Sequence, residues 1–185
     1  MEHNISRHLP WRQRRAERGQ SLVEFAVGSV ILILLMSGLL DLGRLWYIYI
    51  ALEDAAGEAA LYLSLDPFCI DDVDRETGQP YTRPDSSECT DPNNAMYRAE
   101  HAVGPDVLDW NLLHDPDANR INVFVPRDAA GNPVIAVGEP VSVELTYPVE
   151  LLTPIIPRFA GINPIILRSY ATQTVIRVYN DTRDD

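Results

Sequence analysis

FAVGSVILILLMSGLL, residues 25–40, is a run of 16 residues without a charge. Counting back through Ser21, Leu22 and Val23 extends the apolar run to about 20 residues, with Glu24 as its one interruption. A helix needs about 20 apolar residues to cross a hydrocarbon core that is ~30 Å thick. The run therefore predicts a transmembrane helix at about 22–40.

The helical pattern continues beyond this run, and the next proline is Pro67. Apolar side chains recur at helical spacing, at Leu42, Leu45, Trp46, Tyr49, Leu52, Ala56, Ala59, Ala60 and Leu63. We therefore predict one helix over 20–65, about 70 Å long at ~1.5 Å per residue. Its first half is apolar all round, and its amphipathic second half must pack on another element. Trp46, Tyr47 and Tyr49 suit either an aromatic belt at the membrane interface or packing under a head domain.

The charges are strongly segregated along the chain. Residues 1–19 contain five Arg and two acidic residues, a net charge of +3. Because the net charge of the whole chain is −12, residues 20–185 carry a net charge of −15. Positive charge beside a transmembrane segment stays in the cytoplasm, which predicts a single-pass cell-membrane protein, N-in/C-out, with a basic cytoplasmic leader at 1–19 and an extracytoplasmic head at 66–185. A cleaved secretory signal fits less well, because no small-residue cleavage site follows Gly38. Residues 20–185 are acidic enough to repel phosphates, which argues against a nucleic-acid partner.

The start of the head is an acidic loop between Cys69 and Cys89. Outside the cytoplasm these cysteines are expected to form a disulfide; the alternative is two unpaired buried thiols. The loop also carries part of a calcium-loop pattern at Asp71, Asp72, Asp74 and Glu76, followed by Gly78. This Gly is one position late and no Glu stands at the twelfth position, so the pattern favours a solvated acidic loop, with no metal and no cofactor.

The rest of the head predicts an α+β fold. Residues 94–103 are expected to form a short helix that stops at Gly104-Pro105, and a turn is expected over 106–113. Apolar residues alternate with polar ones over 121–125 and 141–147, while 165–178 is β-rich at its end and 134–137 is a candidate short strand. We therefore predict that the long N-terminal helix packs on a small antiparallel sheet of three or four strands. A proline-interrupted apolar loop, residues 151–164, precedes the last strand.

The sequence offers little support for an enzyme. It contains no GxGxxG, P-loop, HExxH or GxSxG pattern, and neither a nucleophile–base pair nor a metal-ligand set is legible. We assign no catalytic residue.

The start of the apolar run carries a more specific pattern, RAERG-QSLVEFAVGSVILILL at residues 15–35. It resembles a class III, type IV pilin-like signal, in which a prepilin peptidase cuts after the glycine on the cytoplasmic side and the apolar helix is retained. The resemblance implies cleavage after Gly19, Gln20 as the new N-terminus and Glu24 as the fifth mature residue. In pilins this carboxylate is proposed to pair with the free N-terminal amine of a neighbouring subunit. The alternative is that Glu24 caps the start of the helix, and the two roles are compatible.

Several further motifs resemble TadE-like proteins, the minor pilins (pseudopilins) of tight-adherence pili. They are G-x-x-x-V-E-F from Gly19, Asp-x-Gly-Arg at residues 41–44, the alanine-rich A-x-x-x-A-A-x-x-A-A before Tyr62-Leu63-Ser64, and the tail VSVELTYPVELLTPIIPRFAG. Asp41 and Arg44 lie three residues apart on one helical face, where they form either an ion pair with each other or contacts to a partner pilin.

The resemblance implies a non-enzymatic minor pilin subunit that takes part in assembly of a tight-adherence pilus for adhesion and surface attachment. The partners it implies are other pilin subunits, the pilus assembly platform, the prepilin peptidase and membrane lipid. The alternative is an unprocessed single-pass membrane protein whose outer domain binds a ligand or an envelope component.

Overall fold

The computed structural model describes residues 11–74, 77–104, 107–115, 120–127, 129, 134–153, 161 and 164–177. The chain divides into two compact units, Met1–Gly43 and Arg44–Asp185. Helix α1 spans Trp11–Leu65 and contributes to both units. The α+β fold class is confirmed.

In the first unit, α1 is apolar on every side. Side chains that point in different directions around the helix, such as those of the consecutive residues Ile31, Leu32 and Ile33, are all largely exposed. Within the described chain, Gly19–Leu65 is the one helix that is long and apolar enough to cross a membrane. The helix begins nine residues before the predicted start at Gln20, so part of the basic leader is helical as well. Its end at Leu65 is as predicted, since Asp66 precedes Pro67 and the residue before a proline disfavours helix.

In the second unit, which we call the head, α1 buries a stripe of small and aliphatic side chains. The stripe consists of Ile48, Ala51, Leu52, Ala55, Ala56, Ala59, Ala60 and Leu63. The alanines let the helix backbone lie close to its neighbours, and the predicted stripe is confirmed from Leu52 onward. Before Leu52 the prediction is wrong at Leu42 and Trp46, which are more than 60% exposed, whereas Leu45 is half-buried against the core. Ile48, which was not predicted, is buried as well.

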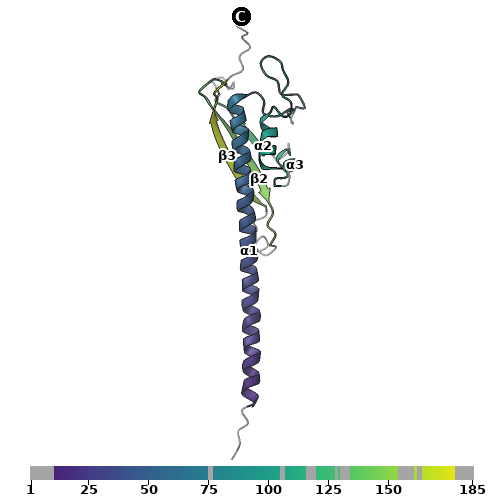
Figure 1. Ribbon diagram of the computed structural model, residues 1–185, viewed down its shortest axis with the longest axis vertical. Helices are drawn as coiled ribbons and strands as arrows, with labels where there is room; N and C mark the ends of the chain where they lie inside the picture. Colours follow the sequence, from purple (N-terminus) through teal and green to yellow (C-terminus); the bar gives the residue numbers. More distant parts are fainter. Residues whose placement is uncertain are drawn as a thin grey trace, which may run out of the picture. The chain divides into compact units, whose positions relative to one another are not determined.

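A three-stranded antiparallel sheet of order β1-β2-β3 packs beside this part of α1 (Figure 1). The strands are β1 (Ile121–Phe124), β2 (Pro140–Val149) and β3 (Ile165–Thr174). β2 is the central strand, and its alternate side chains Val141, Val143, Leu145, Tyr147 and Val149 are buried, as the period of two predicts. The candidate strand at 134–137 is wrong, because these residues lie outside all three strands. β3 starts at Ile165, as predicted, but ends earlier than its β-rich end suggested, with residues 175–177 outside the strand.

Two contacts fix the direction of the sheet relative to the Arg44–Leu65 part of α1. The Arg44 guanidinium donates to the carbonyl of Glu150, just after β2 ends, and the Ile176 amide donates to the Ser64 carbonyl, just after β3 ends. β3 therefore runs in the same direction as this part of α1, and β2 runs in the opposite direction.

Two short helices complete the head. The first, α2 (Ala95–Val103), is confirmed; it starts at the cap residue Asn94 and ends at Gly104, whose φ of 84° suits a glycine. The second, α3 (Trp110–Leu113), occupies the end of the predicted turn region, and the buried Trp110 joins the core.

Candidate functional site

Two residues of the pilin-like signal, Gln20 and Glu24, lie on one face of α1. The Gln20 side-chain amide donates to a Glu24 carboxylate oxygen at 3.1 Å, and both residues are exposed. This contact spans one helical turn, so the residue after the expected cut and the carboxylate of the fifth mature residue are neighbours. In the uncut chain α1 starts well before Glu24, so the carboxylate does not lie at a helix start. Removal of residues 1–19 would bring it into the first turns, where a carboxylate complements the helix dipole.

The glycine at the expected cut is accessible. A Cβ atom built on Gly19 meets nothing within 4 Å, and the same holds for Gly28 further along α1. Packing in the described structure therefore gives no reason for a glycine at position 19, and recognition by a peptidase would give one.

Asp41 and Arg44 have different surroundings. Asp41 is only 4% exposed. The Arg44 guanidinium extends to the end of β2, where it donates to the Glu150 carbonyl at 2.9 Å. The sequence suggested a mutual ion pair or contacts to another pilin. The contact to Glu150 is a third role for Arg44, which its position in the sequence did not indicate.

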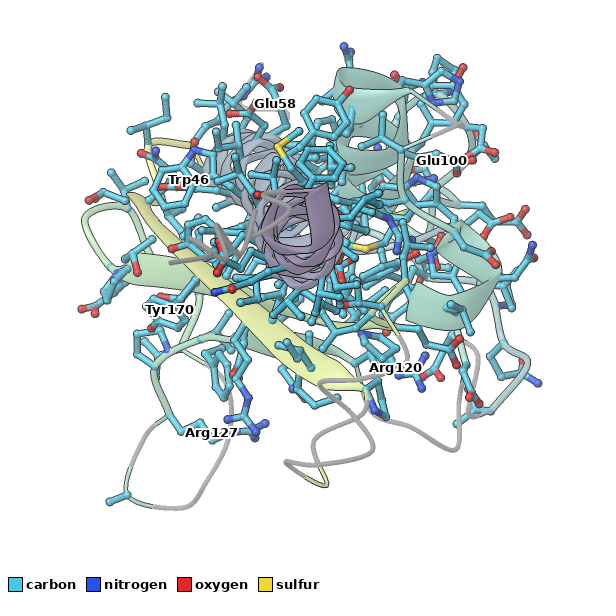
Figure 2. The ribbon with its side chains drawn as sticks, turned by 90° about the horizontal axis from the view of Figure 1, so that it is seen from below. Trp46, Glu58, Glu100, Arg120, Arg127 and Tyr170 are labelled. Atoms are coloured by element: carbon cyan, nitrogen blue, oxygen red, sulfur yellow. A yellow bond between two sulfur atoms is a disulfide. The ribbon has the colours of Figure 1, made fainter. Side chains whose placement is uncertain are left out.

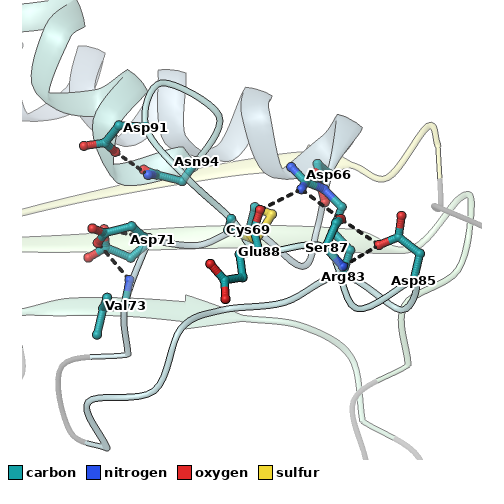
Figure 3. Close-up of a disulfide and its surroundings, with 12 residues drawn as sticks. Asp66, Cys69, Asp71, Val73, Arg83, Asp85, Ser87, Glu88, Asp91 and Asn94 are labelled. Carbon is teal, nitrogen blue, oxygen red and sulfur yellow. Dashed lines mark hydrogen bonds and ion pairs between the residues drawn. A yellow bond between two sulfur atoms is a disulfide. The ribbon is translucent and has the colours of Figure 1, made fainter.

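The predicted disulfide between Cys69 and Cys89 is present, with both cysteines buried and their Cα atoms 5.4 Å apart (Figure 3). It connects the acidic loop to the start of α2. The amides of Ala95 and Met96, the first two of α2, donate to the carbonyls of Cys69 and Ile70, at 3.0 Å each. The disulfide therefore holds the segment that satisfies the free N–H groups at the N-terminus of α2.

The cap residue of α2 is fixed from both sides. The Asn94 side chain accepts a hydrogen bond from the Tyr97 amide at 2.7 Å, and its amide group donates to Asp91 at 2.6 Å (Figure 3). Asn94 is fully buried, so the helix start belongs to the core of the head.

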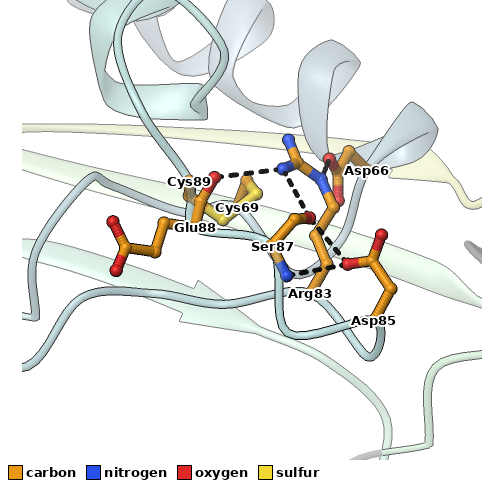
Figure 4. A network of polar contacts seen from close by, with 7 residues as sticks. All are labelled: Asp66, Cys69, Arg83, Asp85, Ser87, Glu88 and Cys89. Atoms are coloured by element: carbon orange, nitrogen blue, oxygen red, sulfur yellow. Dashed lines mark hydrogen bonds and ion pairs between the residues drawn. A yellow bond between two sulfur atoms is a disulfide. The ribbon is translucent and has the colours of Figure 1, made fainter.

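Arg83 is the centre of a polar network in the loop (Figure 4). Its Nε donates to Asp66 at 2.6 Å, directly after α1, and its Nη1 donates to the Ser87 hydroxyl and the Glu88 carbonyl. The Asp66 carboxylate also helps raise the pKa of Tyr62, although burial of that phenol is the larger cause. The network attaches the loop to the end of α1 at a second point, and sequence analysis did not predict it.

The carboxylates of the acidic loop are engaged with the loop backbone. Asp71, Asp72 and Asp74 each accept from a backbone amide of the loop, at 2.9, 2.8 and 3.2 Å. Asp71 is 8% exposed, so the expectation of a wholly solvated loop is wrong at this residue. Glu76 lies outside the described residues, and no cluster of metal-ligating side chains occurs among those that are described.

The predicted aromatic group divides between two environments. Trp46 and Tyr47 are more than 60% exposed, and Trp46 projects from the side of the head (Figure 2). Tyr49 is half-buried, with its ring 6.2 Å from that of Trp46. Packing under the head is therefore wrong for Trp46 and Tyr47.

A groove of about 500 Å³ lies among the acidic loop, α3 and β1. Its charged lining residues are Asp71, Asp74, Asp115, Arg120 and Arg127, accompanied by His114 and apolar side chains.

The described parts thus define a class: a chain with one N-terminal membrane-capable helix and a small disulfide-bonded α+β head, compatible with a single-pass membrane protein. Residues 19–61 match the family model described as TadE-like protein, which confirms the resemblance that the N-terminal motifs suggested. This family is structural and associated with Tad pili. The match begins at Gly19 and covers Glu24, Asp41 and Arg44. No curated protein and no solved structure matches the chain.

Proposed function

We propose that this chain is a minor pilin of a tight-adherence pilus, with an assembly role and no catalytic activity. The family match at residues 19–61 is the observation that carries the proposal, because it starts at the glycine of the expected cleavage site. The exposed, all-round apolar surface of α1 in the first unit supports it, since such a surface needs lipid or other helices around it.

The proposal includes an order of events. The chain inserts with residues 1–19 in the cytoplasm and the acidic head outside. The prepilin peptidase cuts after Gly19, and the assembly platform then transfers the mature chain from membrane lipid into a pilus of other pilin subunits. The lipid and the interior of the pilus are both apolar, so the transfer of the helix between them gains little from the hydrophobic effect. Helix packing and polar pairing must therefore supply the driving force.

Glu24 supplies that pairing. Its carboxylate is exposed on α1 and lies one turn from Gln20. After cleavage Gln20 carries a free amine, and the carboxylate of one subunit binds the amine of its neighbour by a charge-assisted hydrogen bond. An ionised carboxylate is costly in hydrocarbon, so a paired Glu24 is favoured over an isolated one as the helix enters the filament.

The substitution Glu24→Gln tests this role. The neutral amide cannot form the charge-assisted bond, so cleavage and insertion continue while the ratio of pilus-associated to membrane-associated protein falls about tenfold or more. Glu53→Gln is the matched control, because Glu53 is an exposed glutamate of the same helix within the head. If both variants give the wild-type ratio, the pairing is wrong.

The second candidate is an unprocessed membrane protein whose head binds a ligand or an envelope component. The groove at Asp71 and Arg120 is the observation that favours it. In that case the chain would keep residues 1–19, and Glu24→Gln would leave its distribution unchanged.

A further inference from the structure

The groove among the acidic loop, α3 and β1 lies beside an open strand edge. β1 is the first strand of the sheet order and pairs with β2 alone among the described strands. Two of its residues, Ile121 and Val123, line the groove. The free edge of a strand presents unpaired N–H and C=O groups, which form a template for pairing with another chain.

The backbone groups of β1 that point away from β2 can be identified. The Thr146 amide of β2 donates to the Arg120 carbonyl at 2.8 Å, so Arg120 directs its backbone groups toward β2. In an antiparallel pair, successive residues direct their N–H and C=O groups to opposite sides, and the register is continuous along the whole of β1. The N–H and C=O groups of Ile121 and Val123 therefore point outward, and no described residue forms a hydrogen bond with them.

The rest of the lining offers contacts for the side chains of an added segment. Apolar residues of the acidic loop, α2 and α3 line the groove, namely Ile70, Val73, Met96 and Leu113. The groove volume of about 500 Å³ lies within the range of ~300–1,000 Å³ that is typical of ligand sites. Open backbone groups beside apolar side chains suit an extended peptide, whose backbone pairs with the strand while alternate side chains enter the groove.

The charges of the head favour a basic partner. The groove lining contains three carboxylates and two guanidinium groups, those of Asp71, Asp74, Asp115, Arg120 and Arg127. The Arg120 guanidinium donates to the Leu112 carbonyl at 2.7 Å, so it is held against α3. Residues 20–185 also carry a net charge of −15. The field of the head therefore attracts a positively charged segment and repels an acidic one.

We propose that this groove binds an extended, basic segment of a partner polypeptide, which adds to β1 as a further strand. The backbone of the segment pairs with the outward groups of Ile121 and Val123, its apolar side chains pack on the groove lining, and a basic side chain meets the carboxylates. A single extended segment places no constraint on the direction of α1 in the partner, so the contact is compatible with chains that share one membrane. This inference goes beyond the proposed function and does not rest on it.

Binding of a defined peptide to the full chain in phosphatidylcholine nanodiscs tests the contact. The probe is acetyl-Lys-Val-Thr-Val-Thr-Val-Lys-amide, whose residues favour a strand, and isothermal titration calorimetry measures its affinity against a blank of empty nanodiscs. Val123→Pro removes an outward N–H group and leaves the hydrogen bonds to β2 in place, so we expect the affinity to fall about tenfold or more.

Ile166→Pro is the matched control at the other open edge of the sheet. The Val175 amide donates to the Glu139 carbonyl on the β2 side, so the alternation along β3 places the Ile166 amide outward. This variant should bind the peptide as the wild type does, and near-UV circular dichroism checks the fold of both variants. The proposal is overturned if the wild type shows no saturable binding, or if Val123→Pro binds with the wild-type affinity.

N-methylated peptides test the backbone pairing without any change to the protein. An added strand directs the N–H and C=O groups of every second residue toward the edge that it joins. We therefore compare a probe that is N-methylated at its valines with one that is N-methylated at its threonines. One of them should lose about tenfold or more in affinity, while the other binds like the unmodified probe. Equal affinities of the two contradict strand addition.

A third peptide tests the charge of the partner. Replacement of both lysines of the probe by glutamate should weaken binding about tenfold or more, because the carboxylates of the groove then face like charges. An equal or higher affinity contradicts the assignment of a basic segment. None of these results bears on cleavage after Gly19, so failure here leaves the proposed function to its own test.

Discussion

Removal of the Arg83 guanidinium should loosen the acidic loop from the end of α1. The ion pair with Asp66 has an Nε–Oδ2 distance of 2.6 Å, and its two side chains are 15% and 16% exposed. Hydrogen bonds to charged groups contribute ~1.5–3 kcal/mol each when shielded, and exposed ion pairs contribute ~0–1 kcal/mol. A mostly buried pair lies between these cases. Because the other Asp66 oxygen is buried and has no hydrogen-bond partner among the described residues, loss of Arg83 leaves a poorly compensated carboxylate. We expect Arg83→Ala to lower the free energy of unfolding of the head by about 2–3 kcal/mol.

A double-mutant cycle separates the pair from the rest of the network. Asp66→Asn, Arg83→Ala and the double variant are compared with the wild type by urea unfolding of the full chain in detergent, followed by near-UV circular dichroism. We expect a coupling energy of about 1–2 kcal/mol between the two positions. A coupling energy below ~0.5 kcal/mol, the value of an ordinary surface pair, would refute the reasoning that this contact anchors the loop.

Three further changes test the packing of the head. Replacement of Cys69 and Cys89 by Ser should lower the free energy of unfolding by about 3 kcal/mol, measured by urea unfolding, since the disulfide closes a loop with a sequence separation of 20. Leu52→Ala removes a fully buried side chain and should cost about 2–5 kcal/mol in the same assay, against less than ~1 kcal/mol for Leu61→Ala, whose side chain is 46% exposed. Asn94→Ala should cost about 1–2 kcal/mol and speed hydrogen exchange in the first turn of α2; unchanged exchange there would exclude the cap.

The features that repeat along the sequence could be predicted. The uninterrupted apolar run and the absence of proline between Pro10 and Pro67 predicted α1 and its end. The alternation over 141–147 predicted the central strand. The Cys69–Cys89 disulfide followed from the compartment that the charge distribution indicated. These predictions needed only local patterns and one global property of the chain.

Contacts between distant segments could not be predicted. Arg44 meets the end of β2, and Arg83 meets Asp66 across the loop; neither partner is marked by spacing in the sequence. The boundary of the buried face of α1 was also predicted incorrectly: Trp46 fits the helical stripe, yet its side chain is 65% exposed. The last strand was predicted to run too far, because the β-branched residues Val175 and Ile176 lie outside the sheet.

The mass of the mature chain tests the central claim most directly. Intact mass spectrometry of the protein from membranes and from sheared pili should show a chain that begins at Gln20 in both fractions. Gly19→Leu should leave the full-length precursor in the membrane, while Gly28→Leu, at a second glycine with open space around it, should still be processed. A wild-type chain that retains residues 1–19, or a Gly19→Leu chain that still begins at Gln20, would contradict the assignment as a processed pilin.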